Sequence, residues 1–512
     1  MEKLKLFNYK IKPRAYQENI ARVASKRNTL CILPTGLGKT LIAVLVAAYR
    51  LEKLPRSKVL MLAPTRPLVN QHYKTFKDLL NLNSSEFIVL TGKIRPDKRK
   101  NLYVKGRIFF ATPQVIRNDL NNGFLTLNDF SLLIVDECHR SVKKYAYTQV
   151  VEKYVQQSPF PLILGLTASP GGMRDKIEEV KKNLHIEKVE IRTREDLDVK
   201  PYIKRIKFER VYVELPEEFL EIRELLDQAL KERLELLLNY QLLTTTKTTK
   251  KQLLELQNKL GKRYEETNRD PIVARALLAC AQAIKIEHAI DLLETQGITP
   301  LYKYLTGLRS KLTYATKGVL SDPKIIEATR KVKELYVKGI EHPKLEKILH
   351  IVKDEIKENP RTKIIIFANY RSSVEKIVKT LQTEGIEAKE FIGQAKKEGK
   401  GLKQKEQIQI LNEFKYELFN VLVATSVGEE GLDIEEVDTV IFYEPVPSEI
   451  RSIQRRGRTG RTKTGKVIFL ITKGTRDEGY YWSAFHKERR MRGILFDMKR
   501  NEKKTLFDWL QS

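Results

Sequence analysis

A short glycine-containing segment, Pro34-Thr35-Gly36-Leu37-Gly38-Lys39-Thr40, has the residue types that hold phosphate groups. In such segments glycines let backbone N–H groups surround phosphate oxygens, a lysine reaches the β- and γ-phosphates, and a hydroxyl binds Mg²⁺. We assign the last two roles to Lys39 and Thr40. Because Leu33 stands where the strict pattern has its first glycine, an ordinary glycine-rich turn between a strand and a helix is the alternative.

Two adjacent acids, Asp136 and Glu137, follow the apolar run from Leu132 to Val135. Acids directly after a buried strand are costly unless they hold a cation or activate water. We expect Asp136 to bind Mg²⁺ together with Thr40, and Glu137 to position and deprotonate an attacking water. A solvated strand end is the alternative interpretation.

Far downstream, the segment Gln454-Arg455-Arg456-Gly457-Arg458-Thr459-Gly460-Arg461 contains four arginines. This density of cations, interrupted by glycines, favours a clamp on phosphate or on a charged transition state over a solvated face. Arg458 and Arg461 are the expected arginine fingers, which contribute about 10³ to 10⁵ in rate where they occur. Hydrolysis would then require two domains to close on each other.

The composition indicates a globular protein with a polyanionic partner. A chain of 512 residues with 41 % hydrophobic content predicts about three domains with packed cores. The formal net charge of +29 favours nucleic acid as that partner. A membrane is disfavoured, because the longest apolar runs are far too short to span a bilayer.

Targeting and metal-binding signals are weak. The N-terminal residues lack an apolar core followed by small residues, so we expect a cytoplasmic protein. The three cysteines are widely separated, and the seven histidines form no cluster with ligand spacing. We therefore expect neither a disulfide framework nor a zinc site.

Between residues 28 and about 170, short apolar runs alternate with segments that have helical periodicity. The expected strands are 28–33, 59–63, 87–90, 108–111, 132–135 and 162–166. This alternation predicts a parallel sheet wrapped by helices, an α/β fold. Polar or small residues follow the runs, and the carboxyl ends of parallel strands meet at one edge, so we expect these residues to gather beside Lys39.

The middle of the chain, from about 201 to 341, predicts a separate helical domain. Long amphipathic segments at 218–243, 251–263 and 272–295 carry leucines at three- and four-residue spacing, which indicates a helical core. Lys303, Arg309 and Lys311 interleave with Tyr304 and Tyr314. That pattern suits a face that contacts a nucleic-acid backbone, although a solvated charged face is the alternative.

Alternation of strands and helices resumes at Lys363, with expected strands at 364–367, 421–424, 440–443 and 467–471. A basic helical tail follows from about Arg476. We therefore divide the chain into a nucleotide-binding α/β domain at 1–200, a helical domain at 201–341, and a second α/β domain with its tail at 342–512.

The ordered motifs resemble those of superfamily 2 helicases. They are Pro34 to Thr40, Ala63-Pro64-Thr65-Arg66, Asp136-Glu137-Cys138-His139, Thr167-Ala168-Ser169, Ala424 to Ile434, and Gln454 to Arg461. With Gln404-Lys405-Glu406-Gln407 and the helical insertion, the series is most similar to the archaeal Hef helicase and its FANCM relatives. The resemblance implies two RecA-like motor domains with an all-helical domain between them.

The resemblance also implies roles for residues at matching positions. Around the nucleotide these are Arg14, Tyr16, Gln17, His139, Gly431, Asp433 and Gln454. For the phosphates of one nucleic-acid strand they are Thr65, Arg66, Thr91, Gly92, Thr112, Pro113, Asn369, Arg371, Thr425 and Ser426. Hydroxyl groups and exposed N–H groups at strand ends suit phosphate contacts. For each Thr or Ser, helix capping or a turn hydrogen bond is the alternative.

The function that the resemblance implies is an ATP-dependent DNA helicase or translocase that acts on forked and branched DNA in repair, with ATP and Mg²⁺ as cofactors. Replication or repair proteins are the implied protein partners. Because Dicer and RIG-I-type enzymes are similar, an RNA-directed ATPase is the alternative. A third hypothesis, a binding module that uses nucleotide only as a switch, is disfavoured by the intact set of reactive residues.

Some Hef relatives carry a C-terminal nuclease with an E-R-K signature. The tail here has only Lys487-Glu488-Arg489-Arg490, without an accompanying acidic cluster. We therefore expect no nuclease activity from this sequence.

Overall fold

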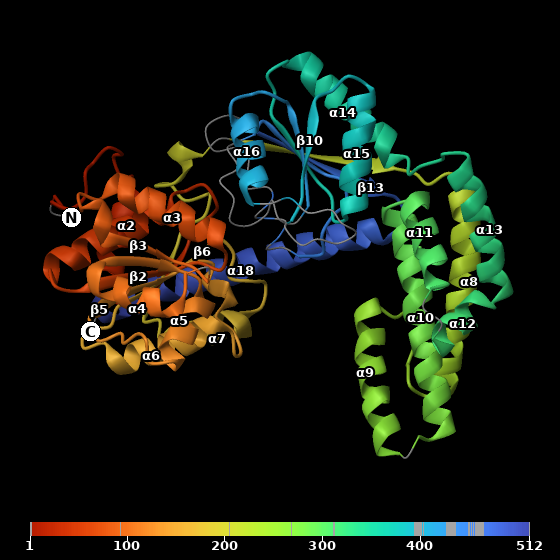
Figure 1. Cartoon of the computed structure of the whole chain (residues 1–512), viewed down its shortest axis with the longest axis horizontal. Helices are drawn as coiled ribbons and strands as arrows, with labels where there is room; N and C mark the ends of the chain where they lie inside the picture. Colours follow the sequence, from red (N-terminus) through yellow and green to blue (C-terminus); the bar gives the residue numbers. More distant parts are fainter. Residues whose placement is uncertain are drawn as a thin grey trace.

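The computed structural model describes residues 3–510 except 93, 204, 268, 311–312, 394–401, 403, 426–436, 449–450, 452, 454 and 456–464, and only the backbone of 404 and 501–510. Two parallel sheets and a helical bundle make up the molecule (Figure 1). The first α/β domain and the bundle lie at opposite ends, with the second sheet between them. The expected fold class is confirmed.

The first sheet has seven parallel strands in the order β3-β4-β2-β5-β6-β1-β7. The strands are β1 (Thr29–Ile32), β2 (Lys58–Leu62), β3 (Phe87–Leu90), β4 (Ile108–Ala111), β5 (Phe130–Val135), β6 (Ile163–Thr167) and β7 (Lys188–Ile191). Strands β1, β4, β5 and β6 are buried at every position, because helices cover both faces. Every expected strand of this domain is present, and the more polar β7 was not predicted.

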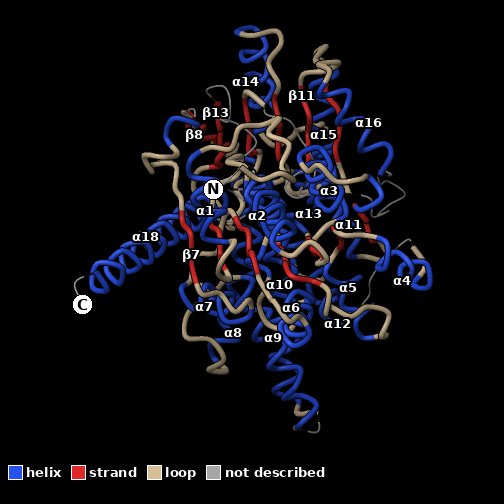
Figure 2. The backbone as a smooth tube through the Cα atoms, turned by 90° about the vertical axis from the view of Figure 1, so that its left-hand side faces the viewer, coloured by secondary structure: helices blue, strands red, loops and turns tan. Residues whose placement is uncertain are grey.

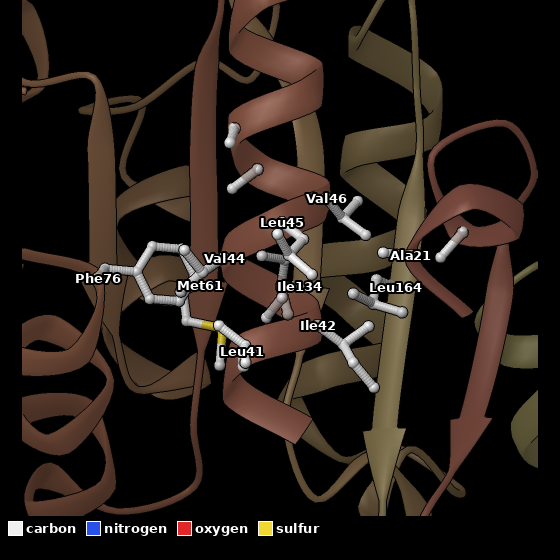
Figure 3. Packing of buried hydrophobic residues seen from close by; sticks show 14 of the residues in the cluster. Ala21, Leu41, Ile42, Val44, Leu45, Val46, Met61, Phe76, Ile134 and Leu164 are labelled. Atoms are coloured by element: carbon white, nitrogen blue, oxygen red, sulfur yellow. The ribbon is translucent and has the colours of Figure 1, made fainter. Parts of the chain in front are cut away.

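Seven helices and three short 3₁₀ segments belong to this domain and its linker. They are α1 (Ala15–Ala24), α2 (Lys39–Lys53), α3 (Arg66–Leu79), η1 (Ser84–Glu86), α4 (Pro96–Lys105), α5 (Pro113–Asn121), η2 (Cys138–Arg140), α6 (Ala146–Gln157), α7 (Arg174–Asn183) and η3 (Lys200–Tyr202). Helices α1 to α3 pack on one face of the sheet, and α5 to α7 pack on the other. Helix α2 is apolar on most sides because it lies between α1 and α3 and over strands β2, β5 and β6 (Figure 3).

The helical bundle comprises α8 (Glu217–Asn239), α9 (Lys250–Glu266), α10 (Pro271–Thr295), α11 (Ile298–Leu308), α12 (Tyr314–Leu320) and α13 (Pro323–Val337). Helix α10 is its centre and contacts α8, α9, α11 and α12. The sequence explains where α10 and α13 begin, because each helix has an aspartate as its N-cap. Asp270 accepts a hydrogen bond from Ile272 N at 2.7 Å, and Asp322 accepts one from Lys324 N at 2.8 Å. The three long helices predicted here are confirmed.

The second sheet has six parallel strands in the order β10-β11-β9-β12-β13-β8. The strands and helices of this domain are β8 (Ile206–Val213), α14 (Lys344–Glu358), β9 (Ile364–Phe367), α15 (Arg371–Thr383), β10 (Ala388–Phe391), α16 (Gln404–Lys415), β11 (Val421–Ala424), β12 (Thr439–Phe442) and β13 (Gly465–Thr472). The placement of β8 corrects the expected helical domain at 201–341, because this strand pairs with β13 along its whole length. Its mixed exposure, typical of an edge strand, hides the β pattern in the sequence.

The C-terminal helix α18 (Arg476–Leu510) connects all three units. It starts against β13 and α10, and then runs back along the first domain (Figure 1). Met491 and Leu495 are buried in a core cluster of the first domain, so this part of the helix packs outside the domain where we expected it. Figure 2 shows its C-terminal end projecting away from the rest of the chain.

Among the residues that the structure describes, no helix combines the length and the apolar character needed to span a bilayer.

Candidate nucleotide site and nucleic-acid edge

The phosphate-binding segment forms the turn between β1 and α2. Gly36 and Gly38 adopt left-handed φ angles of 81° and 78°, which glycine adopts without strain. Gly38 is the N-cap of α2, and the first turn of that helix contains no acidic residue. The free N–H groups and the positive end of the helix dipole therefore favour an anion. Lys39 Nζ donates to Leu33 O at 3.2 Å, so the lysine lies within the turn itself.

Gln17 forms a hydrogen bond with this turn. Its side chain is buried, its Oε1 accepts from Arg14 N at 2.8 Å, and its Nε2 donates to Leu37 O at 3.0 Å. A Cβ atom on Gly38 would lie 2.4 Å from Gln17 Nε2, so only glycine fits there. The residue expected to recognise the base thus holds the turn with its amide nitrogen and the start of α1 with its oxygen.

Arg14 and Tyr16, expected to flank the base, lie close to Tyr202. Tyr16 OH donates to Leu37 O at 2.8 Å, and Arg14 Nη1 donates to Tyr16 OH at 3.1 Å. The Arg14 guanidinium lies 4.5 Å from the centre of the Tyr202 ring, which is partly exposed. Tyr202 belongs to the linker after β7. The planar groups that could stack on a base, the Arg14 guanidinium and the Tyr202 ring, therefore include a residue from the segment that leads to the second domain.

Asp136 directly follows β5 and is held on three sides. Its N donates to Leu62 O at 2.9 Å, its carbonyl accepts from Tyr147 OH at 2.8 Å, and its Oδ2 lies 2.8 Å from His72 Nε2. The other ring nitrogen of His72 lies 3.4 Å from Thr40 Oγ1. The two expected Mg²⁺ ligands, Thr40 and Asp136, are therefore joined through one buried histidine.

The carboxyl group of Asp136 is held in its charged form. Burial raises its pKa, but the charge and hydrogen bond of His72, the charge of Lys39 and a backbone N–H outweigh this, so the pKa lies below its usual value. An ionised carboxylate beside a hydroxyl is a donor set that suits a hard divalent cation. The arrangement therefore fits Mg²⁺, and Thr40 and Asp136 would hold it.

Glu137 leads into a chain of contacts that ends on α18. It adopts a left-handed φ of 47°, which is strained for a residue with a side chain. His139 Nδ1 lies 3.3 Å from Glu137 Oε2 and 3.1 Å from Thr167 Oγ1. Thr167 Oγ1 accepts from Ser169 N at 3.2 Å, and Ser169 Oγ lies 3.1 Å from Met491 Sδ. The expected water-positioning acid is thus linked to the helix that comes from the second domain.

A cavity of about 730 Å³ opens beside the phosphate-binding turn. Pro34 and Thr35 form one side, and residues of the linker, such as Arg192 and Lys200, form another. Helix α18 closes it with Met491. The space next to the turn is therefore framed by the two segments that connect the two α/β domains.

Three adjacent strands of the first sheet bring the expected phosphate contacts to one edge. Thr65 and Arg66 follow β2, Thr91 and Gly92 follow β3, and Thr112 and Pro113 follow β4. Thr65 and Thr112 are the N-caps of α3 and α5, yet neither side chain makes a capping hydrogen bond. Thr65 Oγ1 is buried and has no partner among the described residues. These hydroxyls are therefore not used for helix capping.

In the second domain, Asn369 follows β9, and Arg371 begins α15. Arg371 Nη2 donates to Gly393 O at 3.1 Å. Thr425, after β11, is buried and donates its N–H to Phe391 O at 3.1 Å. Asn369 Oδ1 accepts from Arg455 Nη2 at 3.1 Å, so Asn369 is bound to the arginine-rich segment.

Other expected site residues divide into two groups. Lys303 and Arg309 are exposed on and just after α11, whereas Tyr304 packs into the bundle, with its OH bonded to Lys285 O at 3.1 Å, so the expected interleaved face loses this ring. Lys311, Ser426, Gly431, Asp433, Gln454, Arg458 and Arg461 lie outside the described residues.

His72 and Tyr202 were missed from the sequence. His72 lies on α3 in line with Val69, Phe76 and Leu79, so it is a polar residue at a core position of an amphipathic helix. That break in the apolar stripe was a usable signal. The sequence holds no comparable signal for Tyr202, because its contact with Arg14 depends on how the linker folds.

Three family models match successive parts of the chain. The DEAD/DEAH box helicase model matches residues 14–177, and the helicase conserved C-terminal domain model matches 343–463. Between them, residues 218–339 match a helical bundle described for a provisional ATP-dependent RNA helicase. The three matches follow the order of the first sheet, the bundle and the second sheet.

Among solved structures, the chain is similar to the Pyrococcus furiosus Hef helicase domain, with 46 % sequence identity and a TM-score of 0.72. The match covers 94 % of this chain and 99 % of that one.

Curated relatives carry names from both nucleic-acid classes. A Methanocaldococcus jannaschii protein provisionally named an ATP-dependent RNA helicase is 49 % identical over 95 % of this chain and 61 % of its own length. The ATP-dependent DNA helicase MPH1 of Pyricularia oryzae is 35 % identical over 91 % of this chain and 44 % of its own. The Drosophila melanogaster DEAD-box ATP-dependent DNA helicase Fancm is 33 % identical over 90 % of this chain and 33 % of its own length. The chain thus spans between a third and three fifths of the length of these relatives.

The match to the Hef helicase domain covers nearly the whole of both chains, and the flanking family models agree with the two sheets that it contains. The chain therefore belongs to the ATP-dependent superfamily 2 helicases of the DEAD/DEAH-box type, in the group that contains Hef, FANCM and MPH1.

Proposed function

We propose that this chain is the motor of a DNA helicase or translocase that unwinds or remodels forked and branched DNA in repair. The observation that carries the proposal is one sheet edge that holds Arg66, Gly92 and the uncapped hydroxyl of Thr112, on a chain with a net charge of +29. Such an edge suits a phosphate backbone without reading its bases. The relatives named as DNA helicases support the choice of polymer.

In this proposal the phosphate turn binds ATP, with Lys39 beside the β- and γ-phosphates and Thr40 with Asp136 at Mg²⁺. Thr40 and Asp136 would hold the cation, which would supply positive charge to neutralise the charge that develops on the phosphates. Glu137 orients water, and His139 couples Glu137 to Thr167. Arg458 and Arg461 would reach the phosphates from the second domain, so each cycle of hydrolysis would draw the two phosphate-binding edges together.

The bundle would contact duplex near a branch through exposed cations such as Lys303 and Arg309, and Lys311 joins them in the proposal. Binding should weaken steeply with salt, by about 0.7 to 0.9 log units per log unit of salt for each phosphate neutralised. Reversing the charge of Lys303 and Arg309 should reduce binding of forked DNA more than binding of single strands. Equal losses on both would remove the special role at branches.

An RNA-directed ATPase is the second candidate, because the 49 % identical Methanocaldococcus jannaschii relative carries an RNA helicase name. ATPase activity and strand separation measured side by side on forked DNA, a four-way junction, linear duplex DNA and duplex RNA distinguish the two. We expect the branched DNAs to stimulate most strongly. Stimulation by RNA alone would overturn the DNA assignment, and Lys39→Ala provides the inactive control on every substrate.

A further inference from the structure

The bundle and the second motor domain meet at a hydrogen-bonded group, which we call the polar joint: the buried side chains of Gln296, Ser373 and Glu444, and the partly buried Asn369. Gln296 ends α10 and donates from Nε2 to Glu444 Oε1 at 2.5 Å. Ser373 Oγ donates to Gln296 Oε1. The end of the central bundle helix is thus bonded to residues that follow β12 and begin α15.

Glu444 carries the joint toward the sheet edge where nucleic-acid contacts are expected. Its Oε2 accepts from Asn369 N at 2.6 Å, and Asn369 Oδ1 accepts from Arg455 Nη2 at 3.1 Å. Arg455 is fully buried, with its guanidinium 5.0 Å from the centre of the Phe367 ring. One continuous set of hydrogen bonds therefore leads from α10 to the arginine-rich segment.

The burial of Glu444 makes these bonds expensive to lose. The residue is 1 % exposed, and burial raises the pKa of its carboxyl to about 7. The neighbouring cation, Lys344, donates to Asp477. The charge of Lys344 still favours the ionised carboxyl, while the hydrogen bonds to Glu444 come from amide groups, so a change at either end leaves a buried polar group unsatisfied.

Other contacts fix the bundle to the second domain without reaching the sheet edge. Arg476 Nη2 donates to Glu287 at 2.7 Å, and Arg476 N donates to Glu294 at 3.0 Å. Tyr480 OH donates to Asp291 at 3.2 Å. These pairs make the bundle follow the second domain, so the polar joint is not needed simply to attach it.

We propose that Glu444 is a positioning residue that couples the helical bundle to Asn369 and Arg455, so that nucleic acid held by the bundle sets the rate of ATP hydrolysis. The proposal deepens the function proposed above and rests on it. A shift of α10 moves Gln296, Gln296 moves the Glu444 carboxylate, and the carboxylate sets the position of Asn369 between the strand end and the arginine.

The test uses Glu444→Gln and a variant that exchanges the two groups. Both oxygens of Glu444 accept from N–H groups, so a glutamine there turns an N–H toward a donor as long as Gln296 keeps the orientation in which its Nε2 also donates to Thr295 Oγ1 at 3.2 Å. The double variant Gln296→Glu with Glu444→Gln restores a donor facing an acceptor, and residue 296 still accepts from Ser373. Glu346→Gln, at an exposed carboxylate of α14, is the matched control.

ATPase rates are measured without nucleic acid, with forked DNA and with duplex RNA, together with the KM for ATP, nucleic-acid affinity and thermal unfolding. We expect Glu444→Gln to keep its basal rate and KM while nucleic-acid stimulation falls about tenfold, as the loss of a buried hydrogen bond predicts. The double variant should recover most of the stimulation, and Glu346→Gln should match the wild type.

Three results would overturn the coupling role. They are unchanged stimulation in Glu444→Gln, an equal fall in basal and stimulated rates, and no recovery in the exchanged double variant. If RNA alone stimulates the wild type, the DNA assignment fails. The ratio of the RNA-stimulated ATPase rate to the basal rate, compared between Glu444→Gln and the wild type, still decides the role of Glu444. Stimulation by neither polymer would overturn both proposals.

Discussion

Asp136 and Glu444 occupy equivalent places in the two motor domains, and their carboxyl groups behave in opposite ways. Each follows a fully buried strand, β5 or β12, at the carboxyl edge of its sheet. They are 4 % and 1 % exposed. Yet the pKa of Asp136 lies below its usual value, and that of Glu444 is raised to about 7.

The difference comes from the partners and not from the burial. Burial raises the pKa in both cases, but Asp136 faces His72 and Lys39, which favour its charged form. At Glu444, the charge of Lys344 and the hydrogen bonds from Asn369 and Gln296 also lower the pKa, but they do not outweigh burial and the nearby charge of Asp477. The surroundings of Asp136 therefore favour its charged form, whereas those of Glu444 favour its protonated form.

The largest effect should come from removing the charge at the first edge. Asp136→Asn keeps the shape of the side chain but removes the carboxylate proposed to bind Mg²⁺, so we expect kcat to fall by about 10³, equivalent to several kcal/mol of lost charge stabilisation. Steady-state ATPase assays with saturating forked DNA measure it. Asp129→Asn, at an exposed acid on the same domain, should leave the rate unchanged, and turnover that survives Asp136→Asn would contradict the assignment.

A smaller effect is expected at His72, which touches both proposed ligands of the cation. His72→Ala removes the group that orients Asp136 and Thr40, and such supporting changes typically reduce metal affinity or activity by about 10- to 100-fold. The Mg²⁺ concentration that gives half-maximal ATPase should rise by that factor.

His72→Gln, which can still donate a hydrogen bond to Asp136, should recover part of the loss. Thermal unfolding separates this effect from a general loss of packing on α3. An unchanged Mg²⁺ requirement in His72→Ala would show that the histidine only fills the core.

Sequence patterns predicted the elements that are apolar throughout and the motifs at their ends. Strands β3, β4, β9 and β11 have the predicted bounds, because each is a compact run of apolar residues between polar ones. Strands β7, β8 and β10 are partly polar edge or near-edge strands, so their sequences lack such runs.

The site was predicted where chemistry is local in the sequence and missed where it depends on folding. The turn at Lys39 and the acid at Asp136 are readable because one short segment holds each. The pairing of His72 with Asp136 joins residues 64 positions apart, and that of Gln296 with Glu444 joins residues 148 apart. No single-sequence spacing encodes such pairs.

The smallest effect tests the second edge through pH. Titratable groups near Glu444 are Lys344, Asp477, Tyr370 and Tyr443, so the wild type is compared with Glu444→Gln, which keeps all four. Between its ordinary pKa of 4.5 and the raised value of about 7, Glu444 binds a proton in the folded chain but not in the unfolded one. Stability therefore falls as pH rises through this range and is level above it.

The free energy of unfolding of the wild type, relative to that of Glu444→Gln, should thus decline by roughly 1 to 3 kcal/mol between pH 5 and 8. Chemical denaturation at several pH values measures the difference, and subtracting the variant removes the titration of all other groups. The opposite slope would mean that Glu444 is held ionised, as Asp136 is. In that case both carboxyl groups would be held in their charged form, and Lys344 would have to be the counter-ion of Glu444.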